Sequence, residues 1–266
     1  LALDGVAGGA AKVPLLVHLP GLDEESVKLT PIYELYAAGT RFRKALPTLI
    51  TEAAPGLVKR AAGKSGASHT VYRVGEPHGR VSPRAEYVTS LLALSDSALT
   101  TTNLWGERWS KLVANVMGNG IAAATGLVAK EATADDAIRA FAARLGSEAI
   151  RVGQALGYDL EEILHLDPEI IARAGEGDDA ARAAYDAQRL ADTQKPGGGA
   201  HRASMGQDMM KGRRTEIEFL NGFVVARGAE VGIAAPANAA LTEIVKRVER
   251  GEVAASPELI RGLRLN

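Results

Sequence analysis

One stretch of the chain, residues 109–120, places a cation and two carboxamides among apolar residues. Lys111, Asn115 and Asn119 follow one another at intervals of four residues, and in an α-helix a step of four rotates the side chain by only about 40°. The spacing predicts that all three side chains line one stripe of a helix over 104–127. Such a stripe is either the wall of a polar pocket or a helix edge at a domain boundary, with the lysine in water and the asparagines capping neighbouring backbone.

A lysine in a polar pocket can act as a general acid. Burial disfavours the charged form of an amine and brings its pKa toward the working pH, which proton donation to a developing alkoxide requires. Two carboxamides beside it can orient a hydroxyl or carbonyl group without contributing charge. If the stripe is a pocket wall, Lys111 is the candidate proton donor, and Asn115 and Asn119 are candidate substrate-binding residues.

A second candidate group lies over 204–216. Ser204 is expected in a loop next to glycines, where its hydroxyl and nearby backbone N–H groups could hold a carboxylate. Glu216 is expected in the first turn of a helix that starts at 214–216 and ends near Gly228. Both residues also have ordinary interpretations, since a loop serine need not bind anything and first-turn acids complement the helix dipole.

No metal site is predicted. The five histidines show no zinc-ligand spacing, and the chain contains no cysteine. The lack of cysteine excludes disulfides, thiolate metal sites and a cysteine nucleophile.

The elements that must position these residues divide into two parts. Over residues 1–103 strands and helices are mixed, with a strand over 69–75 and a helix that begins at Ser82-Pro83. From Leu104 onward about six helices follow one another with no strand signal between them. We therefore expect an incomplete α/β domain over 1–103 and an all-helical domain over 104–266, with the best ligand pocket at the seam between them.

Local signals predict several boundaries in more detail. Apolar periodicity predicts a helix over 31–50, and Pro55-Gly56 predicts a turn. Further helices are predicted to start at Thr133-Ala134-Asp135-Asp136, Asp167-Pro168, Asp178-Asp179 and Pro236.

The composition is that of an ordinary soluble globular protein. Of 266 residues 46% are hydrophobic and 24% are charged, and the net charge is -1. Basic residues are spread among acidic ones, so nucleic acid is not an expected partner. No apolar run is long enough for a membrane span, and the first residues lack the basic region of a signal peptide. We expect a cytoplasmic protein in a reducing compartment.

Two glycine-rich segments fail the phosphate-loop tests. Around Gly5, Gly8 and Gly9 no strand precedes the glycines, and Pro14 falls where the helix of a dinucleotide fingerprint should run. The Gly63-Lys64-Ser65-Gly66 segment lacks both the earlier glycine and the strand of a P-loop. Neither segment is predicted to bind a nucleotide phosphate.

Several separate motifs resemble, in order and spacing, the C-terminal domain of the ketopantoate reductases (2-dehydropantoate 2-reductases). The resemblance covers about 69–251. The residues that carry it include Trp109, Lys111, Asn115 and Asn119, then Ala203-Ser204-Met205 with Gln207-Asp208, then Gly212 with Arg214-Thr215-Glu216-Ile217, then Asn221-Gly222-Phe223, and finally Gly232, Pro236 and Asn238.

The resemblance implies a fold and an activity. The fold would be the remnant of a Rossmann-like domain followed by an all-α domain of the 6-phosphogluconate dehydrogenase C-terminal-like type. The activity would be the NADPH-dependent reduction of 2-dehydropantoate, or a close 2-keto acid, in pantothenate biosynthesis. A homodimer through the helical domain is a further expectation.

The resemblance also assigns roles to residues. Lys111 would be the general acid toward the ketone, and Asn115 and Asn119 would contact the substrate. Ser204 would help to hold the substrate carboxylate, and Glu216 would bind its hydroxyl group. Glu216 is also a candidate cofactor contact, together with Asp4 and Gly5, which resemble an Asn-Gly pair that meets the cofactor in the family.

This sequence departs from the family pattern at its start. The glycine fingerprint for the nucleotide is absent, Asp4 stands where asparagine is expected, and His201 stands where family members can carry a substrate-binding asparagine. We therefore expect a truncated chain that keeps the substrate half and binds NADPH weakly or not at all. The alternatives are a reductase of another 2-keto acid, or an inactive relative that serves only as a helical binding or dimerisation module.

Overall fold

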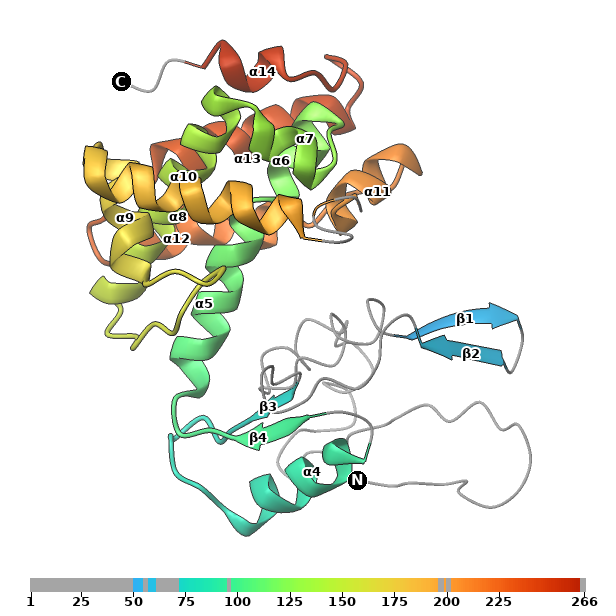
Figure 1. Ribbon diagram of the computed structural model, residues 1–266, viewed down its shortest axis with the longest axis vertical. Coiled ribbons are helices and arrows are strands. Elements are labelled where there is room, and N and C mark those ends of the chain that lie inside the picture. The colour runs from blue at the N-terminus through green and yellow to red at the C-terminus, as the bar shows by residue number, and fades with distance from the viewer. Residues whose placement is uncertain are drawn as a thin grey trace. The chain divides into compact units, whose positions relative to one another are not determined.

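The structure, a computed structural model, describes residues 50–54, 57–60, 72–94, 97–195, 199 and 202–263, and over 50–60 it describes the backbone alone. The chain divides into two compact units, Leu1–Leu104 and Trp105–Asn266. Figure 1 labels their helices and strands.

Two strand pairs make up the described sheet structure of the first unit. Strands β1 (Ile50–Ala54) and β2 (Leu57–Arg60) form an antiparallel hairpin. The helix predicted over 31–50 lies outside the described residues except for Ile50, which belongs to β1. Strands β3 (Tyr72–Val74) and β4 (Ala98–Thr100) are parallel, with Tyr72 opposite Ala98 and Val74 opposite Thr100.

Helix α4 (Pro83–Ala93) connects β3 to β4 and packs against both, so the three elements form a βαβ unit. As predicted, Ser82 caps the helix: its hydroxyl accepts a hydrogen bond from Ala85 N at 3.1 Å. Strand β4 was not predicted from the sequence. The Rossmann-like fold of residues 1–103 stays a prediction, because most of that part lies outside the described residues.

The second unit is helical, which confirms the all-helical prediction for the C-terminal part. Its elements are α5 (Leu104–Val116), α6 (Asn119–Thr125), α7 (Ala129–Ala134), α8 (Asp136–Ala155), α9 (Pro168–Glu176), α10 (Asp179–Gln194), α11 (Ser204–Met210), the 3-10 turn η1 (Ile217–Phe219), α12 (Asn221–Glu230), α13 (Pro236–Glu249) and α14 (Glu258–Arg261). Within the described residues, no helix is long and apolar enough to cross a membrane.

Aspartate side chains start three of these helices by accepting hydrogen bonds from first-turn N–H groups. Asp167 and Asp178 cap α9 and α10, and Pro236 occupies the first turn of α13, as predicted. The predicted start at Thr133 was wrong by two residues. Asp135 is the cap of α8, with its Oδ1 3.0 Å from Ile138 N, while Thr133 belongs to α7.

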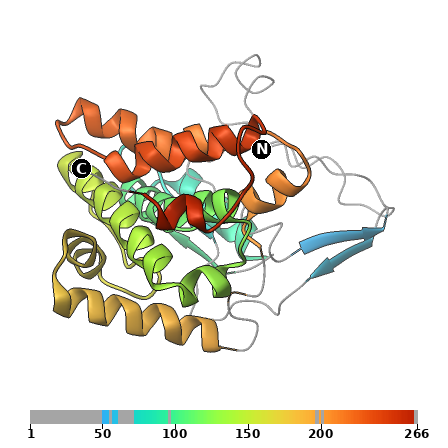
Figure 2. The ribbon, with the colours of Figure 1, turned by 90° about the horizontal axis from the view of Figure 1, so that it is seen from above.

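Helix α8 is the central element of the helical core. It packs against α9, α12, α13 and α14, and in Figure 2 it lies between α13 and α10. Its apolar residues recur at helical spacing, so one face is continuous and buried. The buried residues of this face include Ile138, Phe141, Leu145 and Val152, while Ile150 is buried on the opposite side of the helix.

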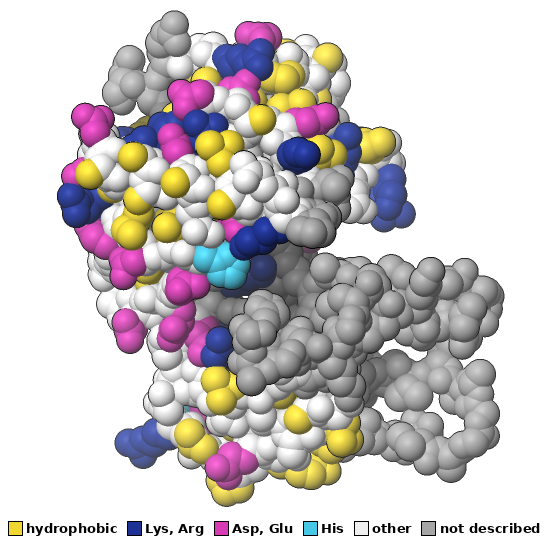
Figure 3. Space-filling view, in the orientation of Figure 1, with side chains coloured by type: hydrophobic (Ala, Val, Ile, Leu, Met, Phe, Trp, Pro, Cys, Tyr) yellow, Lys and Arg dark blue, Asp and Glu magenta, His cyan; other side chains and the backbone are white. Residues whose placement is uncertain are grey.

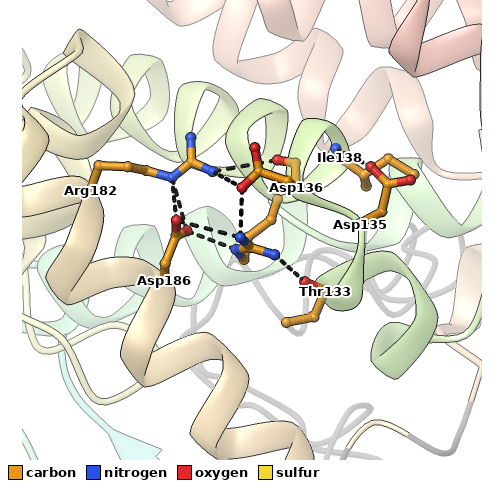
Figure 4. A network of polar contacts seen from close by, with 7 residues as sticks. Thr133, Asp135, Asp136, Ile138, Arg182 and Asp186 are labelled. Carbon is orange, nitrogen blue, oxygen red and sulfur yellow. Dashed lines mark hydrogen bonds and ion pairs between the residues drawn. The ribbon is translucent and has the colours of Figure 1, made fainter.

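An ion-pair network joins the start of α8 to α10 (Figure 4). The buried guanidinium of Arg139 contacts Asp186 at 2.8 Å and Asp136 at 2.7 Å, and it donates to the backbone oxygen of Thr133 at 2.7 Å. Arg182 binds the same two carboxylates. Each charge in this network therefore has an opposite charge beside it, as buried charges require.

Acidic and basic side chains are intermixed on the surface of the helical unit that faces the viewer in Figure 3. Neither sign gathers into a single large patch on that face.

Candidate functional site

The stripe of Lys111, Asn115 and Asn119 spans a break between two helices. The single helix predicted over 104–127 was wrong: α5 ends at Val116, and Gly118 (φ −132°, ψ −40°) precedes α6, which begins with Asn119. Lys111 and Asn115 still share one face of α5. Asn119 is the first residue of the next helix, so its side chain is oriented by α6.

The three stripe residues differ in exposure. Lys111 is half-buried, whereas Asn115 and Asn119 are buried at 7% and 8% exposure. The helix-edge interpretation has the lysine in water and the asparagines capping neighbouring backbone. Buried carboxamides need hydrogen-bond partners, which a pocket or neighbouring backbone can supply, so the pocket wall stays a prediction.

Helix α6 brings the predicted site segments together. Gly120, next to Asn119, lies so close to its neighbours that an added Cβ would be 2.8 Å from Leu241 Cδ2 and 3.0 Å from Ile217 Cδ1. Ile217 directly follows Glu216. Segments 119–120 and 216–217, nearly one hundred residues apart in sequence, are therefore neighbours in space.

Ser204 also lies next to α6, but in a helix rather than in the predicted loop. It is the first residue of α11, and its side chain is exposed. Helix α11 packs on α6: an added Cβ at Gly206 would be 3.2 Å from Ala122 Cβ. Arg202 donates a hydrogen bond to the backbone oxygen of Gly126, which ties the start of α11 to the end of α6.

Glu216 precedes a 3-10 turn. The predicted helix start at 214–216 was wrong, because η1 comes first and α12 begins at Asn221. The half-buried Glu216 is held by its neighbour Thr215, whose N–H donates to Glu249 Oε1 at 2.6 Å. Arg214 pairs with Glu218 at 2.6 Å and is exposed. Thr215 therefore anchors the segment, while no hydrogen bond or ion pair joins the adjacent Glu216 carboxylate to another described residue.

A buried polar network supports these segments from within. Asn221 Nδ2 donates to the backbone oxygen of Val116 at 3.2 Å and to Asn238 Oδ1 at 2.9 Å. The Glu148 carboxylate accepts from the backbone N–H groups of Ala237 and Asn238 at 2.9 and 3.0 Å. The network links the end of α5 to α8, α12 and α13.

Glu148 was not singled out from the sequence. It lies three residues after Leu145 and four before Val152, which are positions of the buried face of the predicted helix. A carboxylate on that face is the signal that could have found it, because buried charges are rare unless they are paired or hydrogen-bonded.

A cavity of about 310 Å³ borders Asn119 within the helical unit. Its lining is mostly apolar and comes from α5, α6, α7, α8 and α10. Asn119 Nδ2 is buried and has no hydrogen-bond partner among the described residues. An unsatisfied buried donor costs about 1–3 kcal/mol, so an acceptor that reached this atom would relieve that cost.

Other predicted site residues are not tested by the structure. Asp4, Gly5 and His201 lie outside the described residues. The pocket expected at the seam between the two parts of the chain stays a prediction. No group of three or more histidine, aspartate or glutamate side chains that could hold a metal ion occurs in the described part of the chain.

Residues 103–249 match the family model described as ketopantoate reductase PanE/ApbA C terminal. The chain is 29% identical over 203 residues to a 2-dehydropantoate 2-reductase from Archaeoglobus fulgidus. That match covers 74% of this chain and 60% of the relative, so it spans less than two thirds of the relative's length.

Solved structures share the fold. The PanE/ApbA family ketopantoate reductase of Ralstonia eutropha JMP134 superposes with a TM-score of 0.55 at 23% identity, covering 76% of this chain and 57% of that one. A D-mandelate dehydrogenase solved with NADH and anilino(oxo)acetate gives 0.54 at 21% identity, covering 76% and 58%.

Proposed function

Because the chain belongs to the family described as ketopantoate reductase PanE/ApbA C terminal, we propose that it forms the substrate-binding and proton-donating half of a reductase of 2-keto acids, with 2-dehydropantoate as the first candidate substrate. One observation carries the proposal most directly. The segments that bear Ser204 and Glu216 both contact α6, the helix that begins with Asn119. Asn119 borders a cavity of the helical unit, and its amide donor has no described partner.

Each side chain in the proposal has a role that its chemistry permits. Lys111 donates the proton to the keto oxygen as that oxygen gains charge. Asn115 and Asn119 orient the substrate through their carboxamides. Ser204, in the first turn of α11, helps to hold the substrate carboxylate, and Glu216 accepts a hydrogen bond from a substrate hydroxyl group.

The proposed cofactor is NADPH, which when bound supplies the hydride. Of the three predicted cofactor contacts, Glu216 alone lies in the described part of the chain. Its half-buried carboxylate fits a ribose hydroxyl as a hydrogen-bond acceptor, as it fits the hydroxyl of a substrate. A nicotinamide cofactor is also consistent with NADH in the D-mandelate dehydrogenase of similar fold.

The test combines binding and turnover. We expect the purified chain to bind 2-dehydropantoate in calorimetry, and Lys111→Met to bind it with little change while any NADPH oxidation is lost. Lys130→Met is the control, since Lys130 is exposed and precedes Glu131 in α7. An unchanged rate for Lys111→Met would remove this lysine as the proton donor.

A second candidate is a helical binding or dimerisation module without catalysis. The match of the family model to the helical residues 103–249 supports this candidate as well. Titration of the purified chain with NADPH separates the reductase from the non-catalytic module, because micromolar binding of NADPH contradicts a chain without a cofactor site. A dimer that neither oxidises NADPH nor binds a 2-keto acid would support the module.

A further inference from the structure

Helix α11 begins without a capping side chain. Its N-cap residue is Ala203, which accepts no hydrogen bond through its side chain, and the helix is only seven residues long. Helices this short are not stable on their own in water, and first-turn N–H groups without a cap favour fraying. The helix therefore depends on contacts with the rest of the helical unit.

Packing holds one side of α11 but not Ser204. Helix α11 packs on α6 (Figure 1), and Met205 and Gly206 are buried in that contact region. Ser204, the first residue of the helix, has an exposed side chain. A further contact near the start of α11 is needed to fix the place of its hydroxyl group.

Arg202, one residue before the N-cap, supplies such a contact. Its half-buried side chain donates a hydrogen bond to the backbone oxygen of Gly126, the C-cap residue of α6. Carbonyl groups at a helix C-terminus have no partner inside the helix, and the helix dipole favours a cation beside them. The contact therefore suits both the guanidinium and the end of α6.

Gln207 closes the same turn from within α11. Its Nε2 donates to the backbone oxygen of Arg202 at 2.9 Å, and its backbone N–H donates to the oxygen of Ala203 at 3.1 Å. Ser204 lies between these residues in the sequence. The segment 202–207 is thus one closed turn, and Arg202 attaches its beginning to α6.

The guanidinium of Arg202 is not engaged by a carboxylate. Among the residues that the structure describes it forms no ion pair, whereas Arg139 and Arg151 each bind two carboxylates. The stem of Arg202 lies against α11, since a Cβ added at Gly206 would be 3.0 Å from Arg202 Cγ. A methionine at this position would keep the stem and lose the charge and the hydrogen bond.

One short helix connects this attachment to the stripe residue Asn119. Asn119 begins α6 and Gly126 caps its end, so the two are about 10 Å apart along the helix axis. We infer that Arg202 is a positioning residue for Ser204: it fixes the start of α11 to α6 and thereby sets the place of the Ser204 hydroxyl relative to Asn119. The inference rests on the proposed function, in which Ser204 helps to hold the substrate carboxylate.

Binding of 2-dehydropantoate to the full chain, measured by calorimetry, tests this role. A hydrogen bond to a charged group is worth about tenfold or more in affinity, so we expect Ser204→Ala and Arg202→Met each to weaken binding about tenfold. Arg202→Lys keeps a cation that can reach the Gly126 oxygen and should restore most of the affinity. Lys211→Met removes an exposed positive charge from the other end of α11 and should leave binding unchanged.

The double variant Arg202→Met/Ser204→Ala separates positioning from a general structural role. If Arg202 acts through Ser204, the double variant binds as tightly as Ser204→Ala alone. A general loosening of the helical unit, or the mere loss of a positive charge, weakens binding in both backgrounds, so that the two losses multiply to about a hundredfold. Should Arg202→Met fail to fold, Gln207→Met, at an exposed position of the same turn, repeats the comparison with Ser204→Ala.

The outcomes keep the inference apart from the proposed function. Full affinity in Arg202→Met or in Ser204→Ala, or losses that multiply in the double variant, overturn the inference and leave 2-keto acid binding by the chain standing. An unmodified chain that does not bind 2-dehydropantoate overturns the proposed function and the inference with it.

Discussion

Glu148 on α8 receives three hydrogen bonds from residues that begin α13, and two of them come from Asn238, through its backbone N–H at 3.0 Å and its Nδ2 at 2.8 Å. A helix start leaves N–H groups without partners inside the helix, and a carboxylate placed there satisfies them and complements the helix dipole. Because Asn238 also contacts Asn221, the carboxylate fixes α13 and α12 together.

Replacing this carboxylate should destabilise the helical unit. Glu148→Gln keeps the volume, but it replaces one of the two acceptor oxygens with an NH2 donor, so the N–H group of either Ala237 or Asn238 loses its acceptor. We expect a loss of about 1–3 kcal/mol in the free energy of unfolding, measured by urea denaturation. Glu230→Gln, at an exposed position of α12, should cost much less, and equal losses would contradict the assigned role of Glu148.

The contact between Trp109 and α8 leaves no room for a side chain at Gly153. The indole Nε1 donates to Ala149 O at 2.7 Å, and a Cβ added at Gly153 would lie 2.4 Å from that same nitrogen. Gly153→Ala should therefore destabilise the unit by about 1–3 kcal/mol through overpacking, although alanine favours a helix.

Gly222→Ala is the matched control for that substitution. Gly222 also lies in a helix, but its added Cβ would be no closer than 3.6 Å to any neighbour. We expect no loss, and a gain of up to about 1 kcal/mol from helix propensity. Thermal unfolding of both variants measures the difference; a stabilised Gly153→Ala variant would show that the indole can move aside.

Acid should weaken the attachment of α9 to α8. Arg151 binds Glu169 at 2.7 Å and Glu176 at 2.6 Å, near the two ends of α9. Hydrogen bonds from Arg151 hold the pKa of both carboxyl groups below the ordinary value of 4.5. A carboxyl group whose pKa is lowered by folding stabilises the protein above its unfolded pKa, and this stabilisation is lost as the pH falls through the folded value.

The measurement is urea unfolding from about pH 6 to about pH 3. We expect the loss of stability on acidification to be smaller in the double variant Glu169→Gln/Glu176→Gln, which has already given up the ion pairs at neutral pH. Glu162→Gln, exposed in the segment before α9, serves as control and should follow the unmodified chain. A double variant with the same pH dependence as the unmodified chain would assign the effect to other carboxyl groups.

Glu249 should matter to ligand binding without touching a ligand. It accepts from Thr215 N at 2.6 Å and so fixes the backbone that carries Glu216. Misplacing a group by about 1 Å can lower a reaction rate about a hundredfold. We expect a milder effect on affinity, so Glu249→Ala should weaken 2-dehydropantoate binding by about tenfold. Glu249→Gln keeps a carbonyl acceptor and should restore most of the affinity, whereas a purely structural loss would appear in the unfolding curve instead.

Helix starts with a short polar cap were predictable because the cap interaction is local. Asp167, Asp178 and Ser82 each bond to N–H groups within three residues, and the sequence places donor and acceptor together. Strand β4 was not predicted because it is only three residues long and pairs with β3, which lies more than twenty residues earlier in the sequence.

The candidate site was predictable in its residues but not in its geometry. The four-residue spacing of Lys111, Asn115 and Asn119 implied one helix, yet Gly118 separates them into two. The periodicity of the sequence does not indicate this break between α5 and α6, because apolar residues continue on both sides of it. Likewise the gathering of α11 and η1 around α6 depends on contacts between segments far apart in sequence.

The crowding at Gly120 has a consequence for anyone who redesigns this protein. The close approach of α6 to the 216–217 segment depends on the missing side chain of Gly120, because a β-carbon there would force the buried terminal methyl groups of Leu241 and Ile217 to move. A mutant library aimed at new substrates should therefore keep position 120 constant and place its diversity at Ala114, Ala132 and Ala142, where the cavity has space for larger side chains.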